Sequence, residues 1–453
     1  MVSSEHPQLT GLGRNPAAPQ DVLVRLAAHR AARPEISRRP GRLEDAVVEA
    51  LLTFGDARTA LVLRGERVSP AMRRRVAEHP DPAIRDAYTD FVREMVEQGT
   101  PLGIDDLEEA YGRPRTVLVG APNARLRAAV ARTWHDRPLS VQVELLADPD
   151  PQVRAAATAA GRPGVPPDWR ERCLADPATR GHVARHAPLT PDQFTQLMRS
   201  GGEEIHGALA ENPHLSAKMV ARLRDVDDPF VRVAVANSRH VDDATRDRLY
   251  ALLEAERAEG GLAADFALSW NPAGPDWVRD VPLDERMRYL DSPHRAFRLV
   301  LASCDDLPEE AWRRLDEDPD PVVRRAAARR PDTPPDVLER LVRAEGEVFS
   351  DRPVLVDHPN YPRHTLPALV DEADPRVRLL ALQDPDLPVT ALRRLAAADE
   401  SFLRSGVAKH PNVTDALLEQ LLSDPDPHVA DNAAANPALR PTRMYRILTD
   451  AGL

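Results

Sequence analysis

The sequence predicts an all-α fold, an α-solenoid of about fourteen tandem two-helix repeats of roughly 26 residues each. Three observations predict it. A proline-rich phrase recurs along the chain, an apolar residue within that phrase recurs at a nearly constant step, and prolines mark the ends of short helical segments. Each repeat is too small to bury its apolar face alone, so stacking of neighbouring repeats is expected.

The recurring phrase is Asp-Pro-Asp-Pro-x-Val, followed in most units by Arg. It stands at 148–154, 318–324 and, without the arginine, at 424–429. We take the apolar residue before the arginine as the anchor of each unit, and many anchors are 26 residues apart. The anchors are Ala57, Ile84, Leu126, Val153, Thr179, Ile205, Val231, Ala264, Phe297, Val323, Val377, Leu403 and Val429.

Each unit begins with a helix-start signal. An aspartate stands three residues before most anchors, for example Asp150 and Asp426, and proline usually follows it. The carboxylate is an N-cap for the unpaired amides of the first turn, and proline suits the first helical position. An arginine four residues after the aspartate, such as Arg154 or Arg378, lies one turn further along. We expect these aspartates and arginines to form a structural ladder.

A proline eight residues past many anchors, as at Pro331 and Pro411, ends the first helix after two or three turns. Thr190 and Thr333, each followed by proline, are predicted to cap the second helix. That helix carries apolar residues fifteen and eighteen positions past the anchor, such as Leu418 and Leu421. Two narrow apolar faces per unit again favour stacking.

This phrase resembles the leucine-rich repeat variant family and the HEAT-like repeats. The resemblance implies a right-handed superhelix in which short α or 3-10 helices alternate with α-helices, and a role in protein interaction. The prototype of the variant family carries an N-terminal iron–sulfur module, but no cysteine precedes Cys173 here, so no cluster is expected. We assign residues 1–14 to a tail, 15–448 to the solenoid with a candidate hinge at 345–363, and 449–453 to a second tail.

Composition and motifs argue against several functions. The net charge of −12 disfavours generic binding of nucleic acid or anionic membrane. Two cysteines are too few for a disulfide framework, and both are expected to be buried. His182 and His186 are one helical turn apart, but no third ligand is identifiable, so no metal, cofactor or catalytic residue is predicted. No apolar run is long enough to span a membrane or direct secretion, and a cytoplasmic location is expected.

Recognition is expected where the period fails, because insertions in solenoids usually map to one face. The irregular segments are 91–115, 249–288 and 345–363, and the aromatic candidates for an interaction surface are Trp270, Trp277 and Tyr361. These features predict a non-catalytic scaffold or adaptor for an unidentified protein or peptide. The alternatives are a HEAT-like enzyme or nucleic-acid-binding protein similar to the alkylpurine DNA glycosylases, and a regulatory subunit of a partner enzyme.

Overall fold

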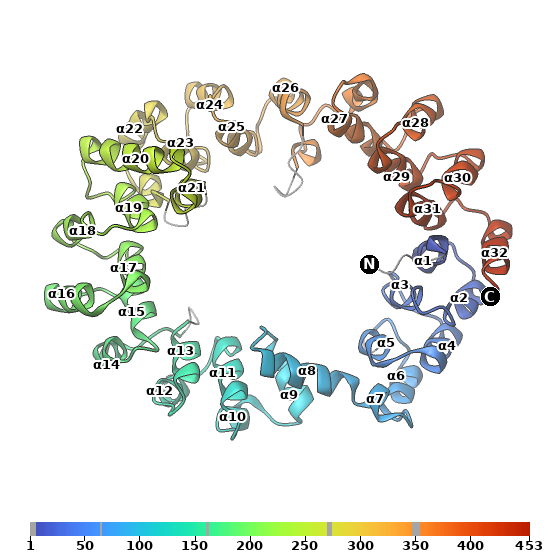
Figure 1. Cartoon of the computed structure of the whole chain (residues 1–453), viewed down its shortest axis with the longest axis horizontal. Helices are drawn as coiled ribbons and strands as arrows, with labels where there is room; N and C mark the ends of the chain where they lie inside the picture. The colour runs from blue at the N-terminus through green and yellow to red at the C-terminus, as the bar shows by residue number, and fades with distance from the viewer. Residues whose placement is uncertain (1–5, 64–65, 160–162, 270–273, 347–353) are drawn as a thin grey trace. The chain divides into compact units, whose positions relative to one another are not determined.

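The computed structural model describes residues 6–63, 66–159, 163–269, 274–346 and 354–453. All regular secondary structure in these ranges is helical, which confirms the all-α prediction (Figure 1). Contacts divide the chain into two compact units. Unit 1 comprises residues 1–91 and 328–453, and unit 2 comprises residues 92–327.

The helices alternate between the two rows of the repeat in each unit. Those of unit 1 are α1 (Pro7–Arg14), α2 (Gln20–Leu26), α3 (Arg33–Ser37), α4 (Asp45–Phe54), α5 (Ala57–Val62), α6 (Pro70–Ala77), α7 (Pro82–Arg85), α26 (Pro335–Glu345), η4 (Leu355–Asp357), η5 (Arg363–Asp371), α27 (Pro375–Leu380), η6 (Ala381–Gln383), α28 (Val389–Ala396), α29 (Ser401–Lys409), α30 (Asp415–Leu422), α31 (Pro427–Ala434) and α32 (Pro441–Asp450). Helix α8 (Ala87–Gln98) begins before residue 92.

The helices of unit 2 after α8 follow the same alternation, with several 3-10 turns. They are α9 (Ile104–Tyr111), α10 (Arg115–Leu118), α11 (Ala124–Thr133), α12 (Leu139–Leu146), α13 (Pro151–Ala159), η1 (Pro167–Trp169), α14 (Arg170–Ala175), α15 (Arg180–His186), α16 (Pro191–Ser200), α17 (Glu203–Ala210), α18 (Ala217–Leu223), α19 (Pro229–Ala236), α20 (Asp243–Ala258), α21 (Leu262–Ser269), η2 (Asp276–Asp280), α22 (Leu283–Arg286), η3 (Met287–Asp291), α23 (Arg295–Leu301), α24 (Glu309–Asp316) and α25 (Pro321–Ala327).

The anchor residues lie in the core of the repeat stack. All of them are buried except Ala57, which is partly buried. The second helices contribute the predicted leucine pairs, and both Leu418 and Leu421 of α30 are 1% exposed. Removing such apolar surface from water stabilises each stack by about 25 cal/mol per Å². Each unit therefore has an aliphatic core that runs from repeat to repeat.

The helix-start prediction is confirmed by the hydrogen bonds of the caps. The Oδ1 of Asp150 accepts a hydrogen bond from the backbone N–H of Gln152 at 2.8 Å, and Asp426 does the same for His428 at 2.9 Å. Thr190 and Gln193 form a capping box at the start of α16. Thr333 differs from the prediction. Its hydroxyl donates to the carbonyl oxygens of Ala328 and Arg330, so it closes the preceding turn instead of capping α26.

The predicted ladder of aspartates and arginines is present. Its arginines bind an aspartate of the following repeat instead of the one that starts their own helix. Arg404 binds both carboxylate oxygens of Asp424, at 2.8 and 3.0 Å, in the following repeat. Arg127 binds Asp148 in the same way. In the Asp-Pro-Asp-Pro phrase the first aspartate thus receives the arginine of the previous repeat, while the second caps its own helix. A bidentate pair fixes both spacing and orientation.

Several boundaries differ from those expected. Residues 7–14, assigned to a tail, form α1, and its Leu9 and Leu12 are fully buried. Its sequence lacks the Asp-Pro start and contains two glycines, which weaken a helix in isolation. Helix α32 extends to Asp450, beyond the expected end at 448. The irregular segment 91–115 is occupied largely by α8 and α9, and the described part of 345–363 lies within unit 1.

Candidate functional site

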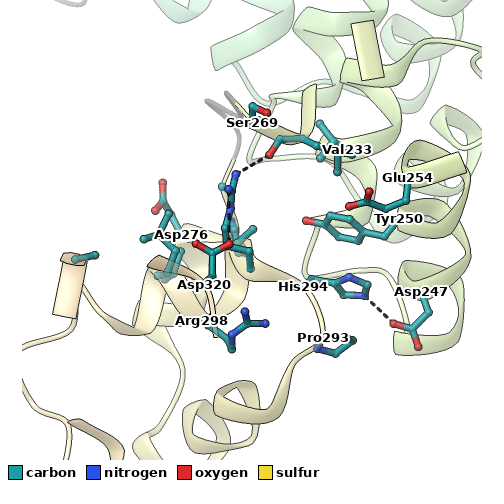
Figure 2. A pocket seen from close by; sticks show the side chains of 18 of the residues that line it. Val233, Asp247, Tyr250, Glu254, Ser269, Asp276, Pro293, His294, Arg298 and Asp320 are labelled. Atoms are coloured by element: carbon teal, nitrogen blue, oxygen red, sulfur yellow. Dashed lines mark hydrogen bonds and ion pairs between the residues drawn. The ribbon is translucent and has the colours of Figure 1, made fainter. Parts of the chain in front are cut away.

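A pocket of about 970 Å³ lies among the lengthened repeats of unit 2 (Figure 2). Helix α20 forms one side, the end of α21 and the turn η2 form another, and α23 closes it from the following repeat. All the lining residues belong to residues 233–326, inside unit 2. The pocket is lined by residues within and on both sides of the segment 249–288, where the sequence period fails.

The length of α20 provides the first wall. This helix has 16 residues, whereas the second helix of an ordinary repeat, such as α30, has 8. Asp247, Tyr250, Glu254 and Arg257 are three or four residues apart, so they lie on one face of the helix. All four line the pocket. The inserted residues therefore extend one face of the helix along the pocket, beyond the length of a regular repeat.

An interruption of the ladder coincides with the opening. Arg298 of α23, which follows the anchor Phe297, binds Asp318 in the next repeat at 2.7 Å. The corresponding residue of α21, directly after the anchor Ala264, is the exposed Asp265. A carboxylate at this position cannot form the arginine bridge to the next repeat. We attribute the space between α21 and α23 to this exchange of a cation for an anion.

Two stacked rings form the floor. The rings of Tyr250 and His294 are 4.0 Å apart between centroids with an interplanar angle of 12°. The Nε2 atom of His294 lies 2.7 Å from the Oδ1 of Asp247, and the Tyr250 hydroxyl donates to the Oδ1 of Asn237 at 2.7 Å. Burial lowers the pKa of His294, although Asp247 acts against that shift. Burial also raises the pKa of Tyr250.

The charges of the pocket alternate in sign. Arg279 lies 3.3 Å from Asp276, and Arg257 pairs with Glu254. Arg295 lies 3.8 Å from Asp320 and donates a hydrogen bond to the carbonyl oxygen of Leu268 at 3.0 Å. Most of these groups are partly exposed. A ligand therefore meets donors and acceptors side by side instead of a field of one sign.

Apolar side chains complete the walls and continue outside them. Leu268, Leu299 and Ala296 line the pocket between the charged groups. On α21, Leu262 is 78% exposed and Phe266 is 57% exposed. These two residues are four apart and share a helix face. A large exposed apolar pair beside a pocket is typical of an interaction surface, because isolated exposed leucines are common but clusters are not.

The predicted surface residues do not converge on the pocket. Trp277 is half-buried; its Nε1 donates to the carbonyl oxygen of Asn237 at 2.7 Å, and its ring packs edge-on against Tyr289 and Phe297. Trp277 therefore supports the wall from behind. Tyr361 belongs to unit 1 and is only 4% exposed. Trp270 lies outside the described residues.

The sequence pattern does not indicate the residues that shape the pocket. Tyr250, His294 and Asp247 join two helices that are about 40 positions apart in the chain, and no local pattern links them. Two signals were nevertheless present. The 33-residue steps around Ala264 indicated a longer helix, and the aspartate in place of the ladder arginine at position 265 indicated a gap.

Other candidate chemistry is weaker. The rings of His182 and His186 contact each other at 4.5 Å, and burial lowers the pKa of His182 to about 4. Among the described residues, no group of three or more metal-ligating side chains comes together. Cys173 and Cys304 are both buried, as predicted. No helix in the described ranges is long and apolar enough to cross a bilayer.

Comparison with known protein families agrees with the predicted repeat pattern. Residues 321–345, which include α25 and α26, match the family model of the leucine rich repeat variant. This segment is therefore similar to one unit of the leucine rich repeat variant. This confirms the predicted resemblance to a HEAT-like helical repeat family.

The chain was also compared with solved structures. An engineered protein solved by the Northeast Structural Genomics Consortium is 15% identical to this chain, with 98% of each chain covered and a TM-score of 0.18. The curated proteins include no match to the chain.

Proposed function

We propose that this leucine rich repeat variant chain is a non-catalytic scaffold that binds a protein through an extended peptide segment. The pocket between α20 and α23 is the recognition site, and it receives an apolar side chain of that segment. The observation that supports this most is the interrupted ladder at Asp265, which coincides with an open pocket whose walls are apolar and whose charges alternate. Apolar walls with a few placed polar groups are typical of binding sites.

The charge pattern favours a peptide over a nucleic acid. Phosphate binding needs cations that are free to release counterions. Arg257, Arg279 and Arg295 each lie beside a carboxylate of the same pocket. An extended peptide presents alternating N–H and C=O groups, which suit alternating acceptors and donors. The partner is therefore expected to combine an apolar anchor with polar or mixed-charge flanks.

The hydrogen bonds of Ser303, one of the hydroxyl residues that line the pocket, support binding more than hydrolysis. His294 beside Asp247 has the composition of a general base and its orienting acid. Nucleophilic catalysis would require a hydroxyl that donates to His294. The Ser303 hydroxyl instead donates to the carbonyl oxygen of Val300 at 2.6 Å and accepts from the Nε of Arg279 at 3.1 Å. In this proposal His294 therefore forms part of the pocket floor and has no catalytic role.

A peptide selection tests the proposal. A phage-displayed library of random peptides is panned against the full chain, and the enriched sequences are measured against two variants by fluorescence anisotropy. Ala296→Trp fills the pocket from α23. Gln152→Trp is the matched control, because Gln152 directly precedes the anchor Val153 as Ala296 precedes Phe297, and it is exposed on a regular repeat.

We expect enriched peptides to contain one large apolar residue and to lose at least about tenfold in affinity with Ala296→Trp, which corresponds to about 1.4 kcal/mol. Affinity for Gln152→Trp should stay within about twofold. Equal binding to both variants would place recognition elsewhere. Salt-sensitive binding of duplex DNA with no peptide enrichment would reverse the choice of ligand class.

A further inference from the structure

Helix α1 packs against α31, so segments from opposite ends of the chain meet within unit 1 (Figure 1). This is the most extensive contact between two helices among the described residues. Leu9 and Leu12 of α1 are fully buried there, as are Val429 and Ala433 of α31. Helix α2 also packs against α32. The first two helices thus cover the last repeat.

The hydrogen bonds show that this contact is a repeat–repeat interface. Asn436 donates from Nδ2 to the carbonyl oxygens of Ala408 and His410, at 2.8 and 3.2 Å, in the repeat before it. Asn15 donates from Nδ2 to the carbonyl oxygens of Ala434 and Asn436, at 2.9 and 2.7 Å. Those two acceptors lie one 26-residue repeat beyond Ala408 and His410. Asn15 therefore occupies the place of the next repeat's asparagine.

The last repeat is adapted to this neighbour. The ladder arginine that follows the anchor in most repeats is replaced by Ala430, and the next residue is Asp431. The guanidinium of Arg14 forms an ion pair with Asp431. Gly11 permits the close approach of α1, because a Cβ atom there would collide with the carbonyl oxygen of Asp431. A first repeat is thus recognised by shape, hydrogen bonds and charge together.

We propose that the face formed by α31 and α32 is a docking surface for the first repeat of this chain, and that a second copy can supply that repeat in exchange for the chain's own. The interface joins residues about 420 positions apart, so no short linker forces the two surfaces to come from one molecule. The contacts that Asn15, Arg14 and Gly11 make with the last repeat are available to the same residues of another copy. Protein concentration during folding then selects between the two arrangements.

The experiment uses the full chain with fluorescent labels on Gln20→Cys and Thr442→Cys. Both positions are exposed and lie on the adjacent helices α2 and α32, whereas the two native cysteines are buried. One preparation carries both labels. Two others carry the donor or the acceptor alone and are mixed, unfolded in urea, refolded together at high concentration, and separated by gel filtration.

We expect strong energy transfer within the doubly labelled monomer, and transfer between copies in a dimer fraction of the refolded mixture. Gly11→Leu should reduce the dimer fraction at least about tenfold and lengthen the distance within the monomer. Asn15→Ala, a milder change, should have the same effect to a smaller extent.

The matched control is Asn212→Ala, since Asn212 donates to the carbonyl oxygens of Ala184 and Ala187 at 2.6 and 2.9 Å within unit 2. It removes the same kind of hydrogen bond but should leave both transfer signals unchanged. The proposal is overturned if the wild-type monomer shows no transfer, if the refolded wild-type mixture forms no dimer with transfer between copies, or if Gly11→Leu leaves that dimer unchanged.

Discussion

The regular repeats around α29 and α31 and the lengthened repeats around α20 and α23 use the same helix positions for opposite purposes. In the regular repeats, Arg404 reaches Asp424 in the following repeat and also donates to the carbonyl oxygens of Ala398 and Asp399. In the lengthened repeats, Asp265 takes the place of such an arginine and a pocket lies beside it. One arrangement closes the space between repeats, and the other leaves a pocket there.

This difference indicates how a repeat array acquires a site without losing its fold. The buried anchors are retained on both sides of the pocket, since Ala264 is 1% exposed and Phe297 is fully buried. The ladder position and the length of the second helix change, and the turn η2 is added. Stability in such arrays is roughly a sum of repeat and interface contributions, so one interface can be opened while its neighbours remain intact.

The largest expected effect is the loss of a ladder arginine from a regular repeat. Arg404→Ala should destabilise the α29–α31 region by about 3 kcal/mol, because it leaves the largely buried carboxylate of Asp424 without its partner. Native-state hydrogen exchange of the α29 and α31 amides measures this locally. The control is Arg394→Ala, whose pair with Asp371 is exposed at 61% and 69% and should contribute less than about 1 kcal/mol. Similar losses in the two variants would contradict the assigned role of the ladder.

A smaller effect is expected from restoring the ladder at the pocket. Asp265→Arg should raise the stability of the α21–α23 region by about 0.5–1 kcal/mol and weaken peptide binding, because a planar guanidinium bridges neighbouring repeats. Asp265→Lys is the control, since it makes the same change of charge without the fork geometry. If the two variants behave alike, charge alone accounts for the opening. Chemical denaturation followed by tryptophan fluorescence reports the change, because Trp277 packs beside the pocket.

The smallest expected effect is a dependence on pH in α15, outside both the pocket and the ladder. Burial lowers the pKa of His182 to about 4 in the folded chain, below the ordinary value of 6.5. The neutral ring is therefore favoured in the folded state, and its contribution to stability is present above pH 6.5 and lost as the pH falls towards 4. His182→Gln should reduce the fall in melting temperature across this window. His186→Gln, at an exposed position one turn further along the same helix, should reduce it less; an equal reduction would contradict the assignment to His182.

Local sequence signals predicted the elements well where each residue acts within its own repeat. The caps at Asp150 and Asp426 and the buried pair Leu418 and Leu421 follow from helix geometry alone. The predictions that needed refinement involve neighbours in space. Thr333 had the residue type of a cap, but its hydroxyl was taken by the preceding turn. Trp277 stays a candidate surface residue, and no local pattern indicates that its indole N–H donates to the carbonyl oxygen of Asn237.

The sequence by itself determined the helical repeat, its period and the positions where the period fails, because helix starts, helix ends and apolar spacing are encoded within about 26 residues. Only the tertiary structure decided which aspartate each arginine binds, that α1 is a helix rather than a tail, and which side chains meet at the pocket. Helix α1 contains Gly11 and Gly13 and has no aspartate cap, so its stability comes from packing against α31. Such contacts join residues hundreds of positions apart, and no local pattern records them.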